Sequence, residues 1–193
     1  MSVTTEQVRK VMRVSAYARG ITTFVIIMIL AALTVALFSL LTGSPAPKFK
    51  FSISAYVFSH ESLQSPQIKA YIIAFIVLTA ALGVGFLYHL RRVFSNLARG
   101  EIFCDANVRN IRHMGTLLIA GGLLSWLAPI LNATVFMFAG HQGIEYRDVP
   151  FVSSGLAPFA YGGMLILLSW IMAVGLGVRE DADALRRDAE LVI

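Results

Sequence analysis

Four uninterrupted apolar runs dominate the pattern of hydrophobic and polar positions along the chain. Each is about as long as the roughly 20 residues that a helix needs to cross the hydrocarbon core of a bilayer. The runs are continuous instead of alternating, which excludes a transmembrane barrel, and an open strand would leave its backbone groups unpaired in lipid. We therefore predict an all-α membrane protein whose four transmembrane helices cover about residues 20–41, 70–90, 114–138 and 158–178.

Two patterns in the polar segments predict structure outside the spans. Residues 4–19 combine valines with basic residues, which indicates a cytoplasmic helix anchored at the membrane surface. Residues 48–57 alternate between apolar and polar positions, as a half-buried strand does. Because a lone strand is unstable in water, we expect it to pair with residues 144–152 in a small extracytoplasmic β-sheet. The alternative is a loop that lies on the membrane surface.

The segment between the second and third runs predicts a helical hairpin. Residues 90–97 continue the second helix, and Gly100 follows where helices often end in a left-handed residue. Cys104 or Asp105 then caps the next helix. The hairpin carries five arginines that are candidate docking residues for a partner: Arg91, Arg92, Arg99, Arg109 and Arg112.

The C-terminal tail has the pattern of an amphipathic helix. Its apolar positions are spaced by four, three, four and three residues, at Val178, Ala182, Leu185, Ala189 and Val192. The charged residues of the tail are five acidic and three basic residues. One interpretation is that the tail folds back on the hairpin or on the extension of the second helix, where opposite charges pair. The other is that hairpin and tail dock a soluble protein, with Leu185, Ala189 and Val192 as its apolar contacts.

Composition and charge support a membrane protein and predict its orientation. Hydrophobic residues make up 57% of the chain and charged residues only 14%, against about 25% charge in soluble domains. Twelve of the 16 basic residues lie in the N-terminal segment, the hairpin and the tail. By the positive-inside rule, both termini and the hairpin are cytoplasmic in a multi-pass protein of the cytoplasmic membrane. Direct nucleic-acid binding is not expected, because the basic residues flank the spans and form no separate domain.

Few chemical groups that could support catalysis lie in the apolar runs. No Asp, Glu, Lys or Arg lies inside a predicted span, which argues against a proton-coupled transporter and against a membrane hydrolase. The single cysteine excludes a multi-cysteine metal site, and we expect no enzyme activity, metal or cofactor. One alternative is haem between His89 and His113, as in four-helix membrane cytochromes. The ordinary explanation is a pair of imidazoles at the membrane surface.

One face of the third span is polar. Ser125, Pro129 and Asn132 lie on it at offsets of four and seven residues. Pro129 removes a backbone donor, so we expect a packing kink in which Asn132 bonds to the second or fourth helix. The alternative is a small ligand pocket on this face.

Small residues and tryptophans predict how the helices pack. Small residues recur every four positions, for example at Gly121 and Ser125 and at Ser169, Ala173 and Gly177. Such faces allow helices to approach closely, so we expect a four-helix bundle. Trp126 and Trp170 lie in mid-span and are expected to pack inside it.

The hairpin also carries a resemblance to a known family. Its sequence Arg-Gly-Glu-Ile-Phe at residues 99–103, followed by Asn-Val-Arg at residues 107–109, resembles the signature of bacterial membrane proteins catalogued as domain of unknown function 2975. The charged ending at residues 185–193 is similar to the ends of many members. The resemblance implies four spans and no established activity. It also implies a partner, because some members are encoded beside small helix-turn-helix regulators.

Together these patterns predict a single four-span membrane domain over residues 1–193. The leading hypothesis is a non-enzymatic regulatory or scaffolding protein in the lipid bilayer that docks a cytosolic regulator. The alternative is a small channel, transporter subunit or export/immunity-type protein acting within the bilayer. It predicts functional sensitivity at Ser125, Pro129 and Asn132.

Overall fold

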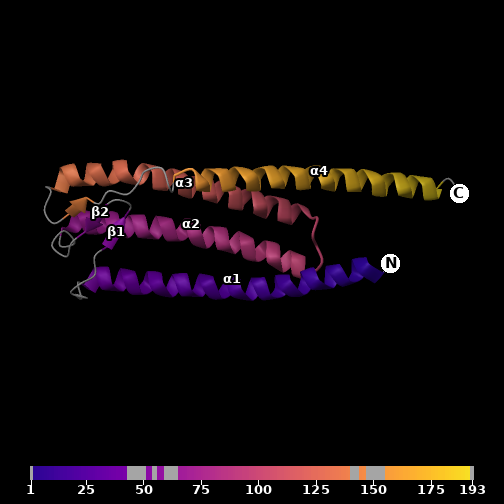
Figure 1. The fold of residues 1–193 in the computed structure, drawn as a ribbon, viewed down its shortest axis with the longest axis horizontal. Coiled ribbons are helices and arrows are strands. Elements are labelled where there is room, and N and C mark those ends of the chain that lie inside the picture. Colours follow the sequence, from indigo (N-terminus) through magenta and orange to yellow (C-terminus); the bar gives the residue numbers. More distant parts are fainter. Residues whose placement is uncertain are drawn as a thin grey trace.

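The computed structural model describes residues 2–42, 51–53, 56–58, 65–139, 144–146 and 155–191. Most of these residues belong to four long helices, α1 (Ser2–Thr42), α2 (Pro66–Ala98), α3 (Asp105–Ala139) and α4 (Ala157–Leu191) (Figure 1). Each helix is long and apolar enough to cross a membrane. This confirms the predicted all-α architecture with four helices of membrane-spanning length.

The helices lie in a row, in the order of the chain. α1 packs on α2, α2 on α3, and α3 on α4, so that α1 and α4 lie on opposite outer sides (Figure 1). Both termini and the α2–α3 turn lie at one end of the molecule, which we call the termini end, and the strands lie at the other, the sheet end (Figure 1). The helices that the structure describes therefore form an open row and do not close into the predicted four-helix bundle.

Polar side chains are prominent among the buried residues, while apolar side chains cover the outside. Large apolar residues are exposed on all four helices, as expected where lipid is the solvent and polar groups must find partners inside the protein. Trp126 and Trp170 are 49% and 55% exposed, so the prediction that they pack inside is wrong. The buried polar residues are Ser15, Thr22, Asn96, Asn107, Asn110, Asn132 and Ser169.

Two glycines allow α3 and α4 to touch. A Cβ atom added to Gly115 would lie 2.7 Å from the carbonyl oxygen of Gly162, and one added to Gly162 would lie 2.8 Å from that of Gly115. No side chain fits between backbones at that separation, so the contact requires glycine on both helices. The predicted small-residue positions Gly121 and Gly177 have open space around them instead. Of the predicted small-residue positions, Ser169 is fully buried, whereas the closest approach of the helices is at Gly115 and Gly162, which were not predicted.

The N-terminal third of α1 supports the α2–α3 turn. Residues 4–19 are helical as predicted, but they continue the first span without a break. Ser15 is buried, and the sulfur of Met12 lies 3.9 Å from where a Cβ atom on Gly100 would stand. This segment is therefore an extension of the span that packs against the turn, and not a separate surface helix.

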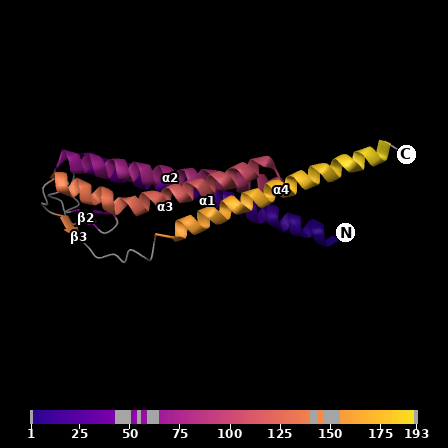
Figure 2. The ribbon, with the colours of Figure 1, turned by 90° about the horizontal axis from the view of Figure 1, so that it is seen from above.

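Three short strands lie at the sheet end, β1 (Phe51–Ile53), β2 (Tyr56–Phe58) and β3 (Ile144–Tyr146) (Figures 1 and 2). They pair antiparallel in the order β1-β2-β3. The expected single strand over residues 48–57 is thus replaced by two strands, of which the second pairs with β3. Residues 48–50 and 147–152 lie outside the described part of the chain, so the wider pairing predicted there stays a prediction.

Candidate functional site

The α2–α3 turn is built from backbone geometry that the sequence pattern anticipates. Gly100 has a φ of 82°, in the left-handed region that glycine adopts without strain, and it follows the end of α2 as predicted. The carbonyl oxygen of Cys104 accepts hydrogen bonds from the amides of Asn107 and Val108. Cys104 is therefore the capping residue, and Asp105 is the first residue of α3.

Two asparagines lock this turn from inside. Nδ2 of Asn96 donates to Oδ1 of Asn107 at 2.8 Å. Asn107 is fully buried, and its own Nδ2 donates to the carbonyl oxygens of Glu101 and Ile102 at 2.8 and 2.9 Å. We call Asn96 and Asn107 the asparagine lock. Neither asparagine was assigned a role from the sequence. The Asn107 amide satisfies carbonyl groups that a tight turn leaves without helical partners, and the Asn96 amide holds the Asn107 side chain in place.

The five hairpin arginines do not form one surface. Arg99 donates to Oδ1 of Asn96 and lies 3.4 Å from a carboxylate oxygen of Glu101, so it belongs to the turn. Nε of Arg91 donates to the hydroxyl of Thr23 at 2.9 Å, which ties α2 to α1. The remaining three are exposed and form no ion pair with the described residues: Arg92, Arg109 and Arg112.

The two predicted histidines meet between α2 and α3. The ring centroids of His89 and His113 are 5.0 Å apart, with the planes inclined by 30°. Nδ1 of His89 is hydrogen-bonded to Oδ1 of Asn110 at 2.9 Å. Rings stacked in this way leave no gap for a macrocycle, so their arrangement does not fit the haem alternative. Within the described residues, no group of three or more His, Cys, Asp or Glu residues could hold a metal ion.

The predicted polar face of α3 is divided in the structure. Asn132 is buried, and its Oδ1 accepts a hydrogen bond of 2.6 Å from the hydroxyl of Tyr71 on α2. Ser125 is exposed and Pro129 is half-buried, and α3 stays helical on both sides of the proline. Tyr71 was missed by sequence analysis, although a tyrosine at the start of a span needs a partner for its hydroxyl.

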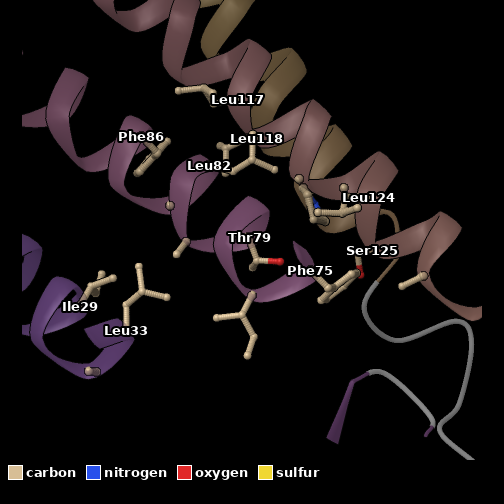
Figure 3. Close-up of a pocket in the computed structure, with 18 of the residues that line it drawn as sticks. Ile29, Leu33, Phe75, Thr79, Leu82, Phe86, Leu117, Leu118, Leu124 and Ser125 are labelled. Carbon is tan, nitrogen blue, oxygen red and sulfur yellow. The ribbon is translucent and has the colours of Figure 1, made fainter. Parts of the chain in front are cut away.

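A hollow of about 910 Å³ lies between α1, α2 and α3 (Figure 3). α2 packs on both neighbours, so the hollow has α2 as its floor and α1 and α3 as its walls. We call it the groove. Its lining is apolar apart from the hydroxyl groups of Thr79 and Ser125. Of the predicted polar face, Ser125 lines the groove, and Pro129 and Asn132 do not. The alternative of a small ligand pocket on that face stays a prediction.

The tail of α4 projects beyond the rest of the molecule. α4 is one helix to Leu191, and its end extends past the α2–α3 turn, away from the end of α1 (Figures 1 and 2). Every side chain that the structure describes from Val178 to Asp188 is exposed, including Leu185 at 70%. The interpretation that the tail folds back on the hairpin is therefore wrong. The side chain of Ala189 and the whole of Val192 lie outside the described part.

Comparison with known proteins gives one finding. A family model described as "Protein of unknown function (DUF2975)" matches residues 53–193, which is well over half of the chain. The matched region includes the hairpin motif and the tail, and it confirms the resemblance inferred from them. No curated protein and no solved structure matches the chain.

Proposed function

The chain belongs to the DUF2975 family of proteins of unknown function, and we propose that it is a non-enzymatic regulatory or scaffolding protein that docks a soluble protein on the tail of α4. The observation that carries this proposal is the continuous, projecting and exposed tail. A helix that leaves its own fold with an exposed apolar stripe is the form in which amphipathic helices enter partner grooves.

The stripe on α4 has a regular period. Apolar residues recur every seven positions at Met164, Ile171, Val178 and Leu185, and each is between 64% and 70% exposed. In the sequence, Val192 continues the same spacing. A seven-residue apolar repeat keeps one seam of a helix toward another helix. Met164 and Ile171 lie in the predicted span and face lipid, so Val178, Leu185 and Val192 are the part of the stripe that supports a soluble helical partner segment.

The charges beside the stripe favour a basic partner over a second copy. Asp181 and Asp188 stand three residues after Val178 and Leu185, at positions that face inward in a parallel helix pair. In a pair of α4 tails, these carboxylates would face their own counterparts and repel. A partner with an apolar ridge and flanking Lys or Arg would match both features. The partner that the family resemblance implies is a small helix-turn-helix regulator.

The orientation follows from the same proposal. The termini end holds the basic flanks of all four helices, so we place it in the cytoplasm and the three-stranded sheet outside. A cytosolic partner then has access to the tail and to the exposed hairpin arginines.

The test is capture from a membrane extract by the detergent-solubilised full-length protein, read by mass spectrometry. We expect a soluble, basic protein that a chain stopped after Arg179 does not retain. Leu185→Glu interrupts the stripe and should lower retention at least about tenfold, which corresponds to roughly 1.4 kcal/mol.

Val14→Glu is the matched control, because Val14 is 66% exposed on α1 at the same end of the molecule. It should retain the partner fully. Equal retention by the full-length and stopped chains would overturn the proposal. The alternative of a channel or transporter subunit would then gain support from altered ion or solute flux in Asn132→Leu.

A further inference from the structure

The histidine pair lies at the mouth of the groove. On α2, the groove-lining residues Phe75, Thr79, Leu82 and Phe86 follow at steps of four, three and four residues, and His89 is the next position on that stripe. On α3, His113 lies one turn before the groove residue Leu117. A separate contact shows that these parts of α2 and α3 lie at the same height, since a Cβ atom on Gly85 would stand 3.3 Å from Cδ1 of Leu117. Figure 3 shows the groove residues Phe86 and Leu117, and the stacked imidazoles lie one helical turn beyond them along α2 and α3, toward the termini end.

Cations surround this mouth. Arg92 lies with its guanidinium carbon 4.9 Å from the ring centroid of Tyr88, one turn beyond His89. On α3, Arg109 stands one turn before His113, and Arg112 directly precedes His113 in the sequence. We call Arg92, Arg109 and Arg112 the cationic collar, which stands beside the histidine pair. The described carboxylates at this end are at the α2–α3 turn or on α1 and α4, and none forms an ion pair with the three arginines.

The apolar groove and the arginines at its mouth together match an amphipathic ligand with a negatively charged head. The groove offers apolar surface along about half the length of a span, and the collar and the histidine pair offer guanidinium and imidazole donors where a lipid headgroup would lie. A second copy of the chain is a poorer occupant. Copies that share one orientation in the membrane would bring the same arginines to the same level, where like charges repel. Among the described helices, α4 packs on α3 and reaches the groove with Pro158 at its first turn.

We propose that the groove and the cationic collar form a binding site for one anionic phospholipid, with its phosphate at the His89–His113 pair and an acyl chain along α2. Arg91 does not belong to the collar, because its bond to Thr23 joins α2 to α1 and closes the groove on that side. The site lies away from the α4 tail. It is therefore independent of the docking function proposed above.

Lipid titration tests the site. The full-length protein, delipidated in a non-ionic detergent, is titrated with phosphatidylglycerol or phosphatidylcholine, and bound lipids are counted by native mass spectrometry. We expect one phosphatidylglycerol to bind in preference to phosphatidylcholine. Arg92→Gln and Arg109→Gln should each lower that preference by about fivefold, since an interfacial cation contributes about 1 kcal/mol toward anionic lipid.

Filling the groove gives the second arm. Gly121 lines the groove and has open space around an added Cβ atom, so Gly121→Leu should fold and lose the bound lipid. Ala32→Leu fills the groove from the α1 wall and should act in the same way. The matched control is Gly163→Leu on α4, which also has open space but lies outside the groove. It should bind phosphatidylglycerol normally.

Four results would overturn the proposal. Equal affinity for the two lipids would show that the collar does not recognise the headgroup. Normal phosphatidylglycerol binding by Gly121→Leu and Ala32→Leu would show that the acyl chain does not lie in the groove. A dimer mass that disappears in Gly121→Leu would assign the groove to a second copy. If inorganic phosphate abolishes phosphatidylglycerol binding and no lipid stays bound, the collar binds a soluble anion instead of a lipid headgroup. Stopping the chain after Arg179 should leave lipid binding unchanged. The lipid site can therefore be supported even if the docking proposal fails, and the reverse.

Discussion

Asn107 holds more of the termini end together than any arginine near it. It is fully buried and joins α2, the turn and α3 through three hydrogen bonds. Asn107→Leu keeps the volume but leaves two carbonyl groups and the Asn96 amide without this partner. We expect a loss of about 3 kcal/mol in the free energy of unfolding, from orphaned buried groups at about 1–3 kcal/mol each. Unfolding in detergent, followed by circular dichroism, measures it.

Arg109→Leu is the control for the asparagine lock. Arg109 lies two residues away, is exposed and makes no contact with Asn96. Its replacement should change stability by less than about 0.5 kcal/mol, as surface substitutions do. If Asn107→Leu proves as mild as this control, the lock does not hold the hairpin.

The Tyr71–Asn132 bond makes a separate prediction inside the membrane. Tyr71→Phe removes the donor, and Asn132→Leu removes the acceptor together with the other contacts of that side chain. A double-mutant cycle isolates the pair, and we expect a coupling energy of about 0.6–1.7 kcal/mol, the range of interhelical bonds in membranes. Unfolding of the four variants in mixed micelles provides the measurement. Additive effects would contradict a direct bond between the two side chains.

At the scale of helix pairs, α3 and α4 approach each other most closely where the backbones of Gly115 and Gly162 meet. Gly115→Ala would place a methyl group 2.7 Å from the Gly162 carbonyl oxygen, so the helices must separate. We expect a loss of about 1–3 kcal/mol, typical of overpacking. Gly163→Ala, one residue from the contact and in open space, should be neutral or slightly stabilising. Thermal unfolding of the two variants distinguishes them, and equal midpoints would mean that the crossing tolerates a side chain.

The sequence predicts the helices better than it predicts their contacts. Apolar run length locates the four helices, and the position of Gly100 locates the end of α2. Apolar side chains do not reveal which face points inward, because lipid accepts them as readily as a neighbouring helix does. The tryptophans and the small residues at Gly121 and Gly177 were misplaced for this reason. Buried polar residues are the better guide in lipid, as Asn132 and Ser169 illustrate.

Hydrogen bonding also explains what the hairpin motif encodes. From the sequence, its arginines stood out as a docking surface, because charge is rare in this chain. In the structure, Arg91 and Arg99 serve the fold, and Asn96 and Asn107 form the lock. Spacing alone does not predict this division, since it depends on which side chains the tight turn brings within bonding distance. Much of the motif therefore specifies a turn.

The open row of the whole molecule follows from its solvent. In water, exposed apolar faces on α1 and α4 would drive the ends of the row together, whereas in lipid that driving force is absent. α1 packs on α2 and α4 packs on α3, so the row keeps a groove on one side and two projecting ends. This arrangement could not be predicted from four apolar runs, because a closed bundle and an open row have the same hydropathy.

The orientation of the row is testable because Cys104 is the only cysteine. It lies at the α2–α3 turn, at the end that we place in the cytoplasm. A membrane-impermeant maleimide applied to spheroplasts should leave Cys104 unlabelled and should label it in inverted vesicles. Ser65→Cys in a Cys104→Ser background reverses the expectation, since Ser65 precedes α2 at the sheet end. Labelling of Cys104 in intact spheroplasts, with Ser65→Cys protected, would invert the topology and remove the tail from the reach of any cytosolic partner.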